Sequence, residues 1–330
     1  MKTLKLKYLS IRILLIFFIV TFANLVKAED LDKFAVAGWS KAISEITNLL
    51  SEPDKGFFKA EGIDLDYVPG TGGGSAIINM LSGAADIAFT DPASFYQAID
   101  KGEKLIAIYN IYPQNVFNVV SPKSRKITKP LDLKGKKIGV YSLSSGTRQN
   151  LQVLLHQVGL TEKDVSIQVT GLLNFAPVIQ GQVDATAATD TGLYVAKLKG
   201  LKDFNVIEVK DYLNVPSDMF VVTEDTYIYK KDLLRRFLSA YKDCTQWMID
   251  NPKEAAKVAK KRSINGRNEV VNFDIIKIRN ASAVSKTTIK KGLGHFDLEL
   301  LQKGADTFKE LGLIKKSIDM SKVVKSDLIP

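Results

Sequence analysis

The sequence predicts an α/β protein made of two domains. Its 330 residues are enough for two domains of ordinary size. Apolar runs typical of strands alternate with helix-like segments, and this order occurs twice along the chain. Two similar apolar segments, Phe117–Pro122 and Met219–Thr223, flank the second series. They look like paired crossings of the chain between two domains.

The first series of elements covers residues 34–109. Its expected strands are Phe34–Gly38, Ile63–Val68, Asp86–Phe89 and Leu105–Tyr109. Its expected helices are Lys41–Leu50, Ser75–Ser82 and Pro92–Lys101. Short connections that contain Gly, Asp or Pro separate these elements. Strands that alternate with helices in this way favour a parallel sheet with crossover helices.

The second series repeats this order. Its expected strands are Ile138–Tyr141, Ser166–Val169 and Asp184–Ala187, and its expected helices are Thr147–Val158, Phe175–Gln180 and Thr191–Lys199. The C-terminal third is strongly helical, with expected helices Lys231–Asp250, Lys253–Lys261 and Leu298–Leu311. We therefore expect a first domain of residues 29–118 and 222–330 and a second domain of residues 119–221. Two connecting strands would form a hinge near Val119 and Val221.

Residues 1–28 have the organisation of a secretory signal. A basic start precedes the apolar run Ile13–Ala23, and Val26-Lys27-Ala28 resembles a signal peptidase site. We expect cleavage after Ala28 and a periplasmic mature protein, with an uncleaved membrane anchor as the alternative. Five bases and no acids lie in this segment, so removing it lowers the net charge from +10 to +5. A mildly basic remainder gives no reason to expect a nucleic-acid partner.

The sequence gives no indication of catalysis, a metal or a cofactor. Its two histidines, His156 and His295, are far apart and have no Cys or His neighbour at metal-ligand spacing. No phosphate-binding loop, dinucleotide fingerprint or G-x-S-x-G elbow is present. The only cysteine, Cys244, lies on a helical apolar stripe and is expected in the core. We therefore expect no catalytic residue, no metal ligand and no bound cofactor.

Polar and glycine-rich loops follow the expected strands of both domains. In open α/β folds, ligands bind at the carboxyl ends of the strands, so these loops are the expected binding site. The glycine run 70–74 and the loop 141–147 each open a helix, where backbone N–H groups can face a ligand. The alternatives are that the glycines only connect elements and that Asp91 only caps a helix. The candidate ligand-binding residues are Trp39, Ser40, Thr71, Gly72, Gly73, Gly74, Ser75, Thr90, Asp91, Tyr112, Ser142, Ser144, Ser145, Gly146, Thr147 and Asn174.

Four short sequence segments resemble those of a known protein family. They are GFFKAEGIDL at 56–65, LSGAADIA at 81–88, DLKGKKIGV at 132–140 and IQGQVDA at 179–185. In order and spacing they are similar to the substrate-binding proteins of ABC importers for nitrate, sulfonates, taurine and pyrimidine precursors. The resemblance covers roughly residues 33–225, and the C-terminal third contains no segment that is similar to the family.

The resemblance implies a type 2 periplasmic binding fold, in which two α/β domains close around a ligand. It implies a monomer that captures a small organic molecule and delivers it to an inner-membrane ABC permease with its ATPase. The molecule would be a sulfonate, a pyrimidine-like compound or another aromatic or heteroaromatic compound. One alternative is a ligand-sensing receptor of the same fold. Another is a pyrimidine-precursor biosynthetic enzyme, which one cysteine and two isolated histidines disfavour.

Overall fold

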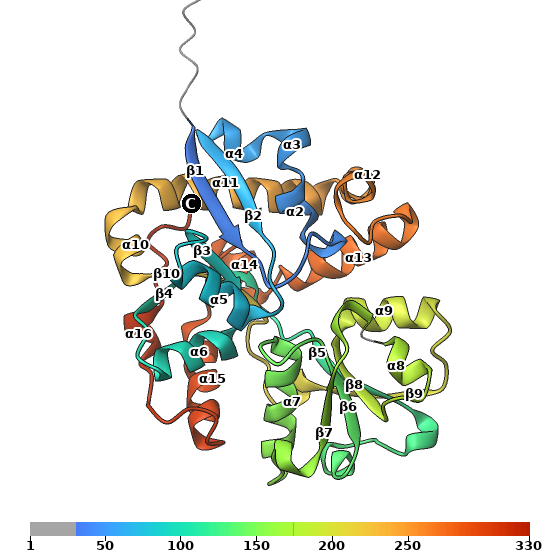
Figure 1. The fold of residues 1–330 in the computed structure, drawn as a ribbon. Helices are drawn as coiled ribbons and strands as arrows, with labels where there is room; N and C mark the ends of the chain where they lie inside the picture. Colours follow the sequence, from blue (N-terminus) through green and yellow to red (C-terminus); the bar gives the residue numbers. More distant parts are fainter. Residues whose placement is uncertain (1–30, 174) are drawn as a thin grey trace, which may run out of the picture.

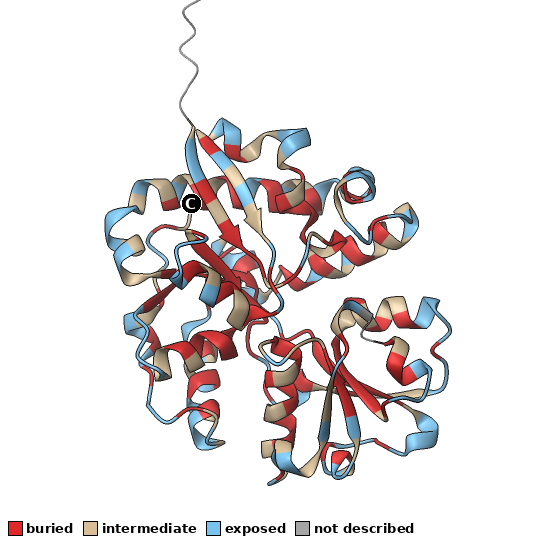
Figure 2. Cartoon of the chain, viewed as in Figure 1, coloured by how far each residue is buried: buried red, intermediate tan, exposed pale blue. Residues whose placement is uncertain are grey.

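The computed structural model describes residues 31–173 and 175–330 and contains two five-stranded sheets with helices packed on them (Figure 1). The expected signal peptide, residues 1–28, and the candidate residue Asn174 lie outside the described residues. Buried residues concentrate in the strands and on the helix faces that cover them (Figure 2). Each sheet therefore has its own hydrophobic core.

The first sheet has the strand order β2-β1-β3-β10-β4. Its strands are β1 (Asp32–Ala37), β2 (Ile63–Val68), β3 (Ile87–Thr90), β4 (Leu105–Tyr112) and β10 (Asp218–Thr223). Strand β1 is parallel to β2 and β3, whereas β10 is antiparallel to both β3 and β4. The sheet is thus mixed, because one strand from late in the chain is inserted between two early ones.

The second sheet has the order β7-β6-β8-β5-β9 and the same plan. Its strands are β5 (Phe117–Pro122), β6 (Lys137–Val140), β7 (Ser166–Val169), β8 (Ala185–Thr189) and β9 (Phe204–Glu208). Strand β6 is parallel to β7 and β8, and β5 is antiparallel to β8 and β9. The sequence did not predict β9.

The chain passes between the two sheets twice. Val119 lies in the middle of β5 and Val221 in the middle of β10, and each strand is paired on both sides. The residues that leave the sheets are 113–116, between β4 and β5, and 209–217, between β9 and β10. The connections therefore lie a few residues before the expected hinge positions, because hydrogen bonds on both sides hold a central strand in its sheet.

Twelve α-helices of the described chain accompany the first sheet. They are α2 (Thr47–Leu50), α3 (Glu52–Lys55), α4 (Phe57–Ala60), α5 (Gly73–Leu81), α6 (Pro92–Asp100), α10 (Glu224–Tyr229), α11 (Lys231–Asp250), α12 (Pro252–Arg262), α13 (Glu269–Ser282), α14 (Lys286–Lys291), α15 (Leu298–Glu310) and α16 (Met320–Val323). Helices α7 (Gly146–His156), α8 (Ala176–Ile179) and α9 (Asp190–Leu198) accompany the second sheet. Short 3₁₀ turns are η1 (Ser44–Ile46), η2 (Lys123–Arg125), η3 (Pro130–Leu133), η4 (Glu162–Asp164), η5 (Gly171–Leu173) and η6 (Val209–Asp211).

The long helix α11 shows how the C-terminal third completes the first domain. Its apolar stripe packs on the first sheet, where Phe237 stacks on Phe34 of β1 with ring centroids 4.6 Å apart. Cys244 lies on the same stripe, is fully buried, and donates through Sγ to the carbonyl of Tyr241. Burial raises the pKa of the Cys244 thiol well above its ordinary value, which is typical of an unreactive core cysteine.

Within the part of the chain that the structure describes, no helix combines the length and apolarity needed to cross a membrane. In the same residues, no three side chains among His, Cys, Asp and Glu are grouped as metal ligands.

Candidate ligand-binding site

A cavity of about 300 Å³ lies between the two sheets, and both domains line it. Five aromatic side chains contribute to its wall. They are Trp39 after β1, Tyr112 at the end of β4, Phe117 on β5, Tyr141 after β6 and Phe175 before α8. A volume of this size, walled mainly by aromatic and aliphatic groups, is typical of small-molecule sites.

Eight of the sequence-predicted residues line this cavity. They are Trp39, Gly72, Gly73, Asp91, Tyr112, Ser145, Gly146 and Thr147. They come from the carboxyl ends of strands in both sheets, as the topology rule for open α/β folds requires. Their contact with a ligand stays a prediction.

The other described candidates do not line the cavity, and several hold the loops together instead. The Thr71 carbonyl accepts hydrogen bonds from the hydroxyls of Ser142 and Ser144, and the Gly74 N–H donates to the Ser144 carbonyl over 3.1 Å. These contacts join the glycine-rich loop of the first domain to the loop 141–147 of the second. The two loops thus close one side of the cavity.

The remaining three candidates have local roles in the first domain. The Ser40 carbonyl accepts from the Tyr67 hydroxyl over 2.8 Å, and the buried Thr90 hydroxyl donates to the Gly73 carbonyl over 2.9 Å. Ser75 is partly exposed in the first turn of α5. Neighbouring loop positions point to different sides, which is why a loop identified correctly from sequence supplies only some of its residues to the wall.

Trp39 presents both an aromatic ring and an unsatisfied donor at the cavity. Its ring packs edge-on against Phe89, with centroids 6.3 Å apart. Its indole Nε1 is buried, and no hydrogen-bond partner reaches it among the described residues. A buried donor without a partner is costly, so this N–H is suited to a ligand acceptor.

Asp91 lines the cavity and also caps a helix. It is 3% exposed, and its Oδ1 accepts from the Ser94 N–H over 2.9 Å at the start of α6, where Pro92 occupies the first turn. Its Oδ2 accepts from the Ser94 hydroxyl over 2.9 Å. Burial raises the pKa of Asp91 to about 6, against the lowering effect of these hydrogen bonds. The capping role expected as an alternative is therefore present.

Four charged residues of the cavity, Glu45, Lys199, Asp218 and Arg279, were missed by the sequence analysis. Asp218, the first residue of β10, and Arg279, on α13, both line it. Asp218 lay just before the recognised segment Met219–Thr223, and no helix was predicted over 269–282. The signal that could have found Arg279 is the polar cap of its helix, since Asn268 accepts from Val270 N–H and Val271 N–H.

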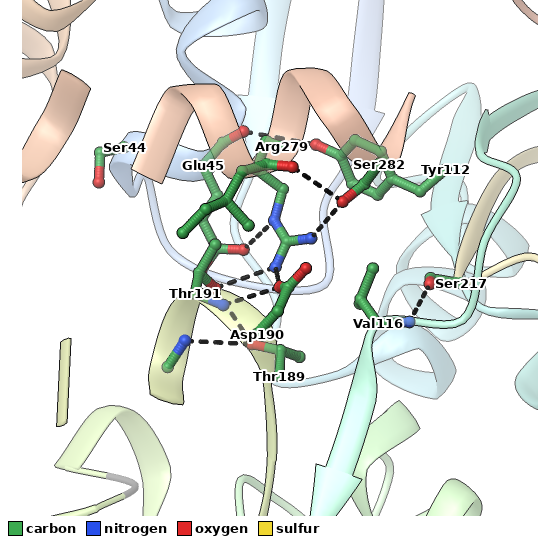
Figure 3. A network of polar contacts seen from close by, with 12 residues as sticks. Ser44, Glu45, Tyr112, Val116, Thr189, Asp190, Thr191, Ser217, Arg279 and Ser282 are labelled. Carbon is green, nitrogen blue, oxygen red and sulfur yellow. Dashed lines mark hydrogen bonds and ion pairs between the residues drawn. The ribbon is translucent and has the colours of Figure 1, made fainter. Parts of the chain in front are cut away.

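Arg279 is the centre of a polar network that spans the two domains (Figure 3). Its Nε donates to Glu45 of η1 over 2.7 Å, and its Nη2 donates to Asp190 and Thr191 of α9 over 2.5 Å and 2.9 Å. The guanidinium also lies 5.4 Å from the ring centroid of Tyr112. Helix α13 of the first domain is thereby tied to α9 of the second.

The electrostatics of Arg279 agree with this geometry. The side chain is 1% exposed, which by itself lowers the pKa of its guanidinium. The charges of Asp190 and Glu45 outweigh burial and raise the pKa above the ordinary arginine value. Arg279 is therefore fully charged, and its charge is shared between two carboxylates.

Comparison with known proteins places the chain in a family. A family model described as NMT1/THI5 like matches residues 43–255, which is more than half of the chain. The chain belongs to the NMT1/THI5-like family. The match begins just before η1 and ends in α12, so it includes the whole second sheet of this NMT1/THI5-like protein and all strands of the first sheet except β1.

Relatives of this NMT1/THI5-like protein have different names. A Haemophilus influenzae protein named for thiamine biosynthesis is 25% identical over 205 residues, which is 61% of this chain and 64% of that relative. The chain thus matches slightly less than two thirds of that relative's length. Riboflavin-binding protein RibY of Chloroflexus aurantiacus is 21% identical over 88% of this chain and 85% of its own length.

Among solved structures, the alkanesulfonate-binding protein SsuA of Xanthomonas axonopodis pv. citri, bound to MOPS, has a TM-score of 0.68. It is 16% identical, and the alignment covers 90% of this chain and 99% of that one. The predicted family resemblance and the predicted two-domain α/β fold are both confirmed. The ligands that two of these names give, riboflavin and an alkanesulfonate, differ in chemistry.

Proposed function

We propose that this protein is a periplasmic substrate-binding protein that captures a small aromatic or heteroaromatic molecule between its domains and delivers it to an ABC permease. The observation that carries the proposal is the cavity of about 300 Å³ lined by both domains. A ligand there would contact both halves of the molecule at once. Its binding energy would then favour the closed arrangement over an open one.

Contacts across the cavity support a clamp. The loop hydrogen bonds around Thr71 lie on one side, and the Arg279–Asp190 ion pair lies on another. The Tyr194 hydroxyl of α9 also donates to Asp274 of α13. Each of these contacts between the domains is polar and involves only a few side chains. Such contacts can break and re-form as the cleft opens and closes.

The aromatic wall supports a ring-shaped ligand. Trp39, Tyr112 and Phe175 approach the cavity from three elements, which offers stacking and edge contacts. The two named curated relatives carry vitamin names, thiamine and riboflavin, and both vitamins are heteroaromatic. A sulfonate, which the related SsuA structure names, is the second ligand class.

Transport is favoured over catalysis. Among the described residues that line the cavity there is no cysteine and no histidine, the side chains that most often act as a nucleophile or a general base. A ligand-sensing receptor of the same fold would use the same cavity. A permease gene and an ATPase gene next to this gene would support transport, and a neighbouring sensor gene would support the receptor.

The proposal is tested by ligand capture from a mixture. Mature protein, residues 29–330, is incubated with the small-molecule fraction of a cell extract and analysed by native mass spectrometry. We expect one additional mass per protein molecule and a smaller radius of gyration in solution scattering. Absence of both changes would reject the clamp.

A further inference from the structure

The carboxylate of Asp218 is buried at the cavity without a protein partner. Asp218 is 8% exposed and lines the cavity. No donor among the described residues makes a hydrogen bond to its side chain, whereas Asp91 accepts from Ser94, and Glu45 accepts from Arg279. At the cavity wall, the carboxylate of Asp218 is therefore free to accept a hydrogen bond from a ligand.

The backbone holds Asp218 firmly in this place. Asp218 pairs with Tyr112 of β4, which also lines the cavity. The register between β10 and β4 then shifts between Asp218 and Met219, because β4 has one extra residue, Ile111, at that point. Such irregularities often re-aim side chains next to binding sites. The carboxylate is therefore fixed on a sheet rather than on a loop.

The charges around Asp218 make this part of the cavity acidic. The charged groups that act on it are Asp91 at the start of α6, Glu45 on η1 and Arg279 on α13. Arg279 is the only cation among them, and it is shared by Glu45 and Asp190. Lys199, the other cation of the lining, is an exposed residue. Burial and the charge of Asp91 accordingly raise the pKa of Asp218 well above its ordinary value.

We propose that Asp218 selects the ligand by accepting a hydrogen bond from an N–H group of a cationic or amino-substituted ring molecule held among the aromatic side chains. Sulfonates, nitrate and other small anions are disfavoured, because Asp218 and Asp91 line the cavity and Arg279, the buried cation there, is already paired with Glu45 and Asp190. A cationic ligand would favour the ionised form of Asp218, against the burial that raises its pKa. The inference rests on the proposed function and narrows its ligand class. Of the two ligand classes considered above, it favours heteroaromatic ring compounds over sulfonates.

The first experiment needs no ligand. Asp218→Asn keeps the shape and removes an ionisable carboxyl whose ionised form burial disfavours, so the empty mature protein at neutral pH should melt at least about 2 °C higher than the wild type. Asp64→Asn, at an exposed acid on β2 of the same sheet, is the matched control and should leave the melting temperature unchanged. A lower melting temperature for Asp218→Asn would show that the carboxylate is structural and would overturn the inference.

The second experiment uses matched probes and isothermal titration calorimetry. One pair is 4-amino-2-methylpyrimidine and 2,4-dimethylpyrimidine, and the other is benzylamine and benzenesulfonate. We expect the amino member of each pair to bind at least about 10-fold more tightly to the wild type, as for a hydrogen bond to a charged group. Asp218→Asn should reduce that ratio to near unity, and Asp64→Asn should preserve it.

The outcomes separate this inference from the proposed function. Tighter binding of benzenesulfonate than of benzylamine, or no binding of either amino probe, would overturn the selection by Asp218. Capture of an anion from the cell extract would overturn it too, yet would leave the proposed function intact. Capture of an amine or amino-heterocycle whose affinity falls at least about 10-fold in Asp218→Asn would support both.

Discussion

Arg279 and Asp190 form a 2.5 Å ion pair although they belong to different domains. Arg279 lies near the end of α13, and Asp190 is the first residue of α9. The same guanidinium holds Glu45 of the first domain at 2.7 Å. Opening the cleft would separate Arg279 from Asp190 but not from Glu45. The Arg279–Asp190 ion pair therefore stabilises the closed cleft over the open one.

Replacing Arg279 by methionine should weaken the closed state. The change leaves Glu45 and Asp190 without their cation, and breaking a buried pair in this way costs about 3 kcal/mol or more. The Asp190 side chain is already 35% exposed and that of Glu45 is 14% exposed, so we expect the lower end of that range, together with a larger radius of gyration. Chemical denaturation and solution scattering measure the two effects.

Arg236→Met is the matched control for Arg279→Met. Arg236 pairs with Asp32 at 2.6 Å and Asp232 at 3.0 Å on the surface of the first domain. Exposed pairs contribute at most about 1 kcal/mol, and this one does not cross the cleft. Equal losses in the two variants would contradict a special role for Arg279.

Gly72→Ala should block closure while leaving each domain folded. A Cβ at Gly72 would lie 2.4 Å from the Ser144 carbonyl oxygen, which belongs to the other domain. Its φ of +133° adds backbone strain that is independent of the cleft. Gly83→Ala, at φ +80° with open space around it, carries a comparable backbone strain and no clash.

Both glycine variants should lose about 1–3 kcal/mol of stability. Only Gly72→Ala should also fail to compact on adding the cell-extract ligand, as measured by solution scattering. If Gly72→Ala compacted as well as Gly83→Ala, the contact between the loops would not be needed for closure.

The part of the cavity wall that the sequence predicted is formed by loops that directly follow strands. Loops after parallel strands gather at one sheet edge, so Trp39, Gly72 and Asp91 could be placed together before any coordinates were known. The strands Ile63–Val68 and Ser166–Val169 and the helix Lys231–Asp250 were predicted with the bounds that the structure has. Clear apolar periodicity explains this agreement.

The charged residues could not be predicted because they depend on distant partners. Arg279 lies 234 residues from Glu45 and 89 from Asp190 in the sequence, and no local pattern links them. Asp218 lies at the cavity only because β10 is inserted next to β4, with a shifted register. Both facts belong to tertiary structure, which a reading of local patterns does not contain.

Asp91 should make the protein less stable as the pH rises from about 4 to above 6. Its pKa of about 6 in the folded protein lies above the ordinary 3.8, so the folded state binds the proton more tightly than the unfolded state. The stabilisation is complete below pH 3.8 and is lost as the pH rises through about 6. The difference of about 2 units corresponds to on the order of 3 kcal/mol.

Chemical denaturation between pH 4 and pH 7 checks this dependence. Asp91→Asn should reduce the slope, since asparagine still caps α6 but does not ionise, and the slope that remains belongs to groups such as Asp218, whose pKa is raised as well. Asp297→Asn, at the exposed N-cap of α15, should keep the wild-type curve. An unchanged slope in Asp91→Asn would assign the pH dependence to another group.

Ligand binding should change tryptophan fluorescence through Trp39 and not through Trp247. Trp39 lines the cavity with an unpartnered indole N–H, whereas Trp247 on α11 contacts Phe57, with ring centroids 6.0 Å apart, and donates to Glu254 over 3.3 Å. Trp247→Phe should therefore preserve the signal that the captured ligand produces. Trp39→Phe should abolish it and weaken binding by roughly 1–3 kcal/mol, since both an aromatic contact and a donor are lost. Fluorescence titration of the two variants with the same ligand makes the comparison, and a signal of full size with unchanged affinity in Trp39→Phe would remove Trp39 from the binding site.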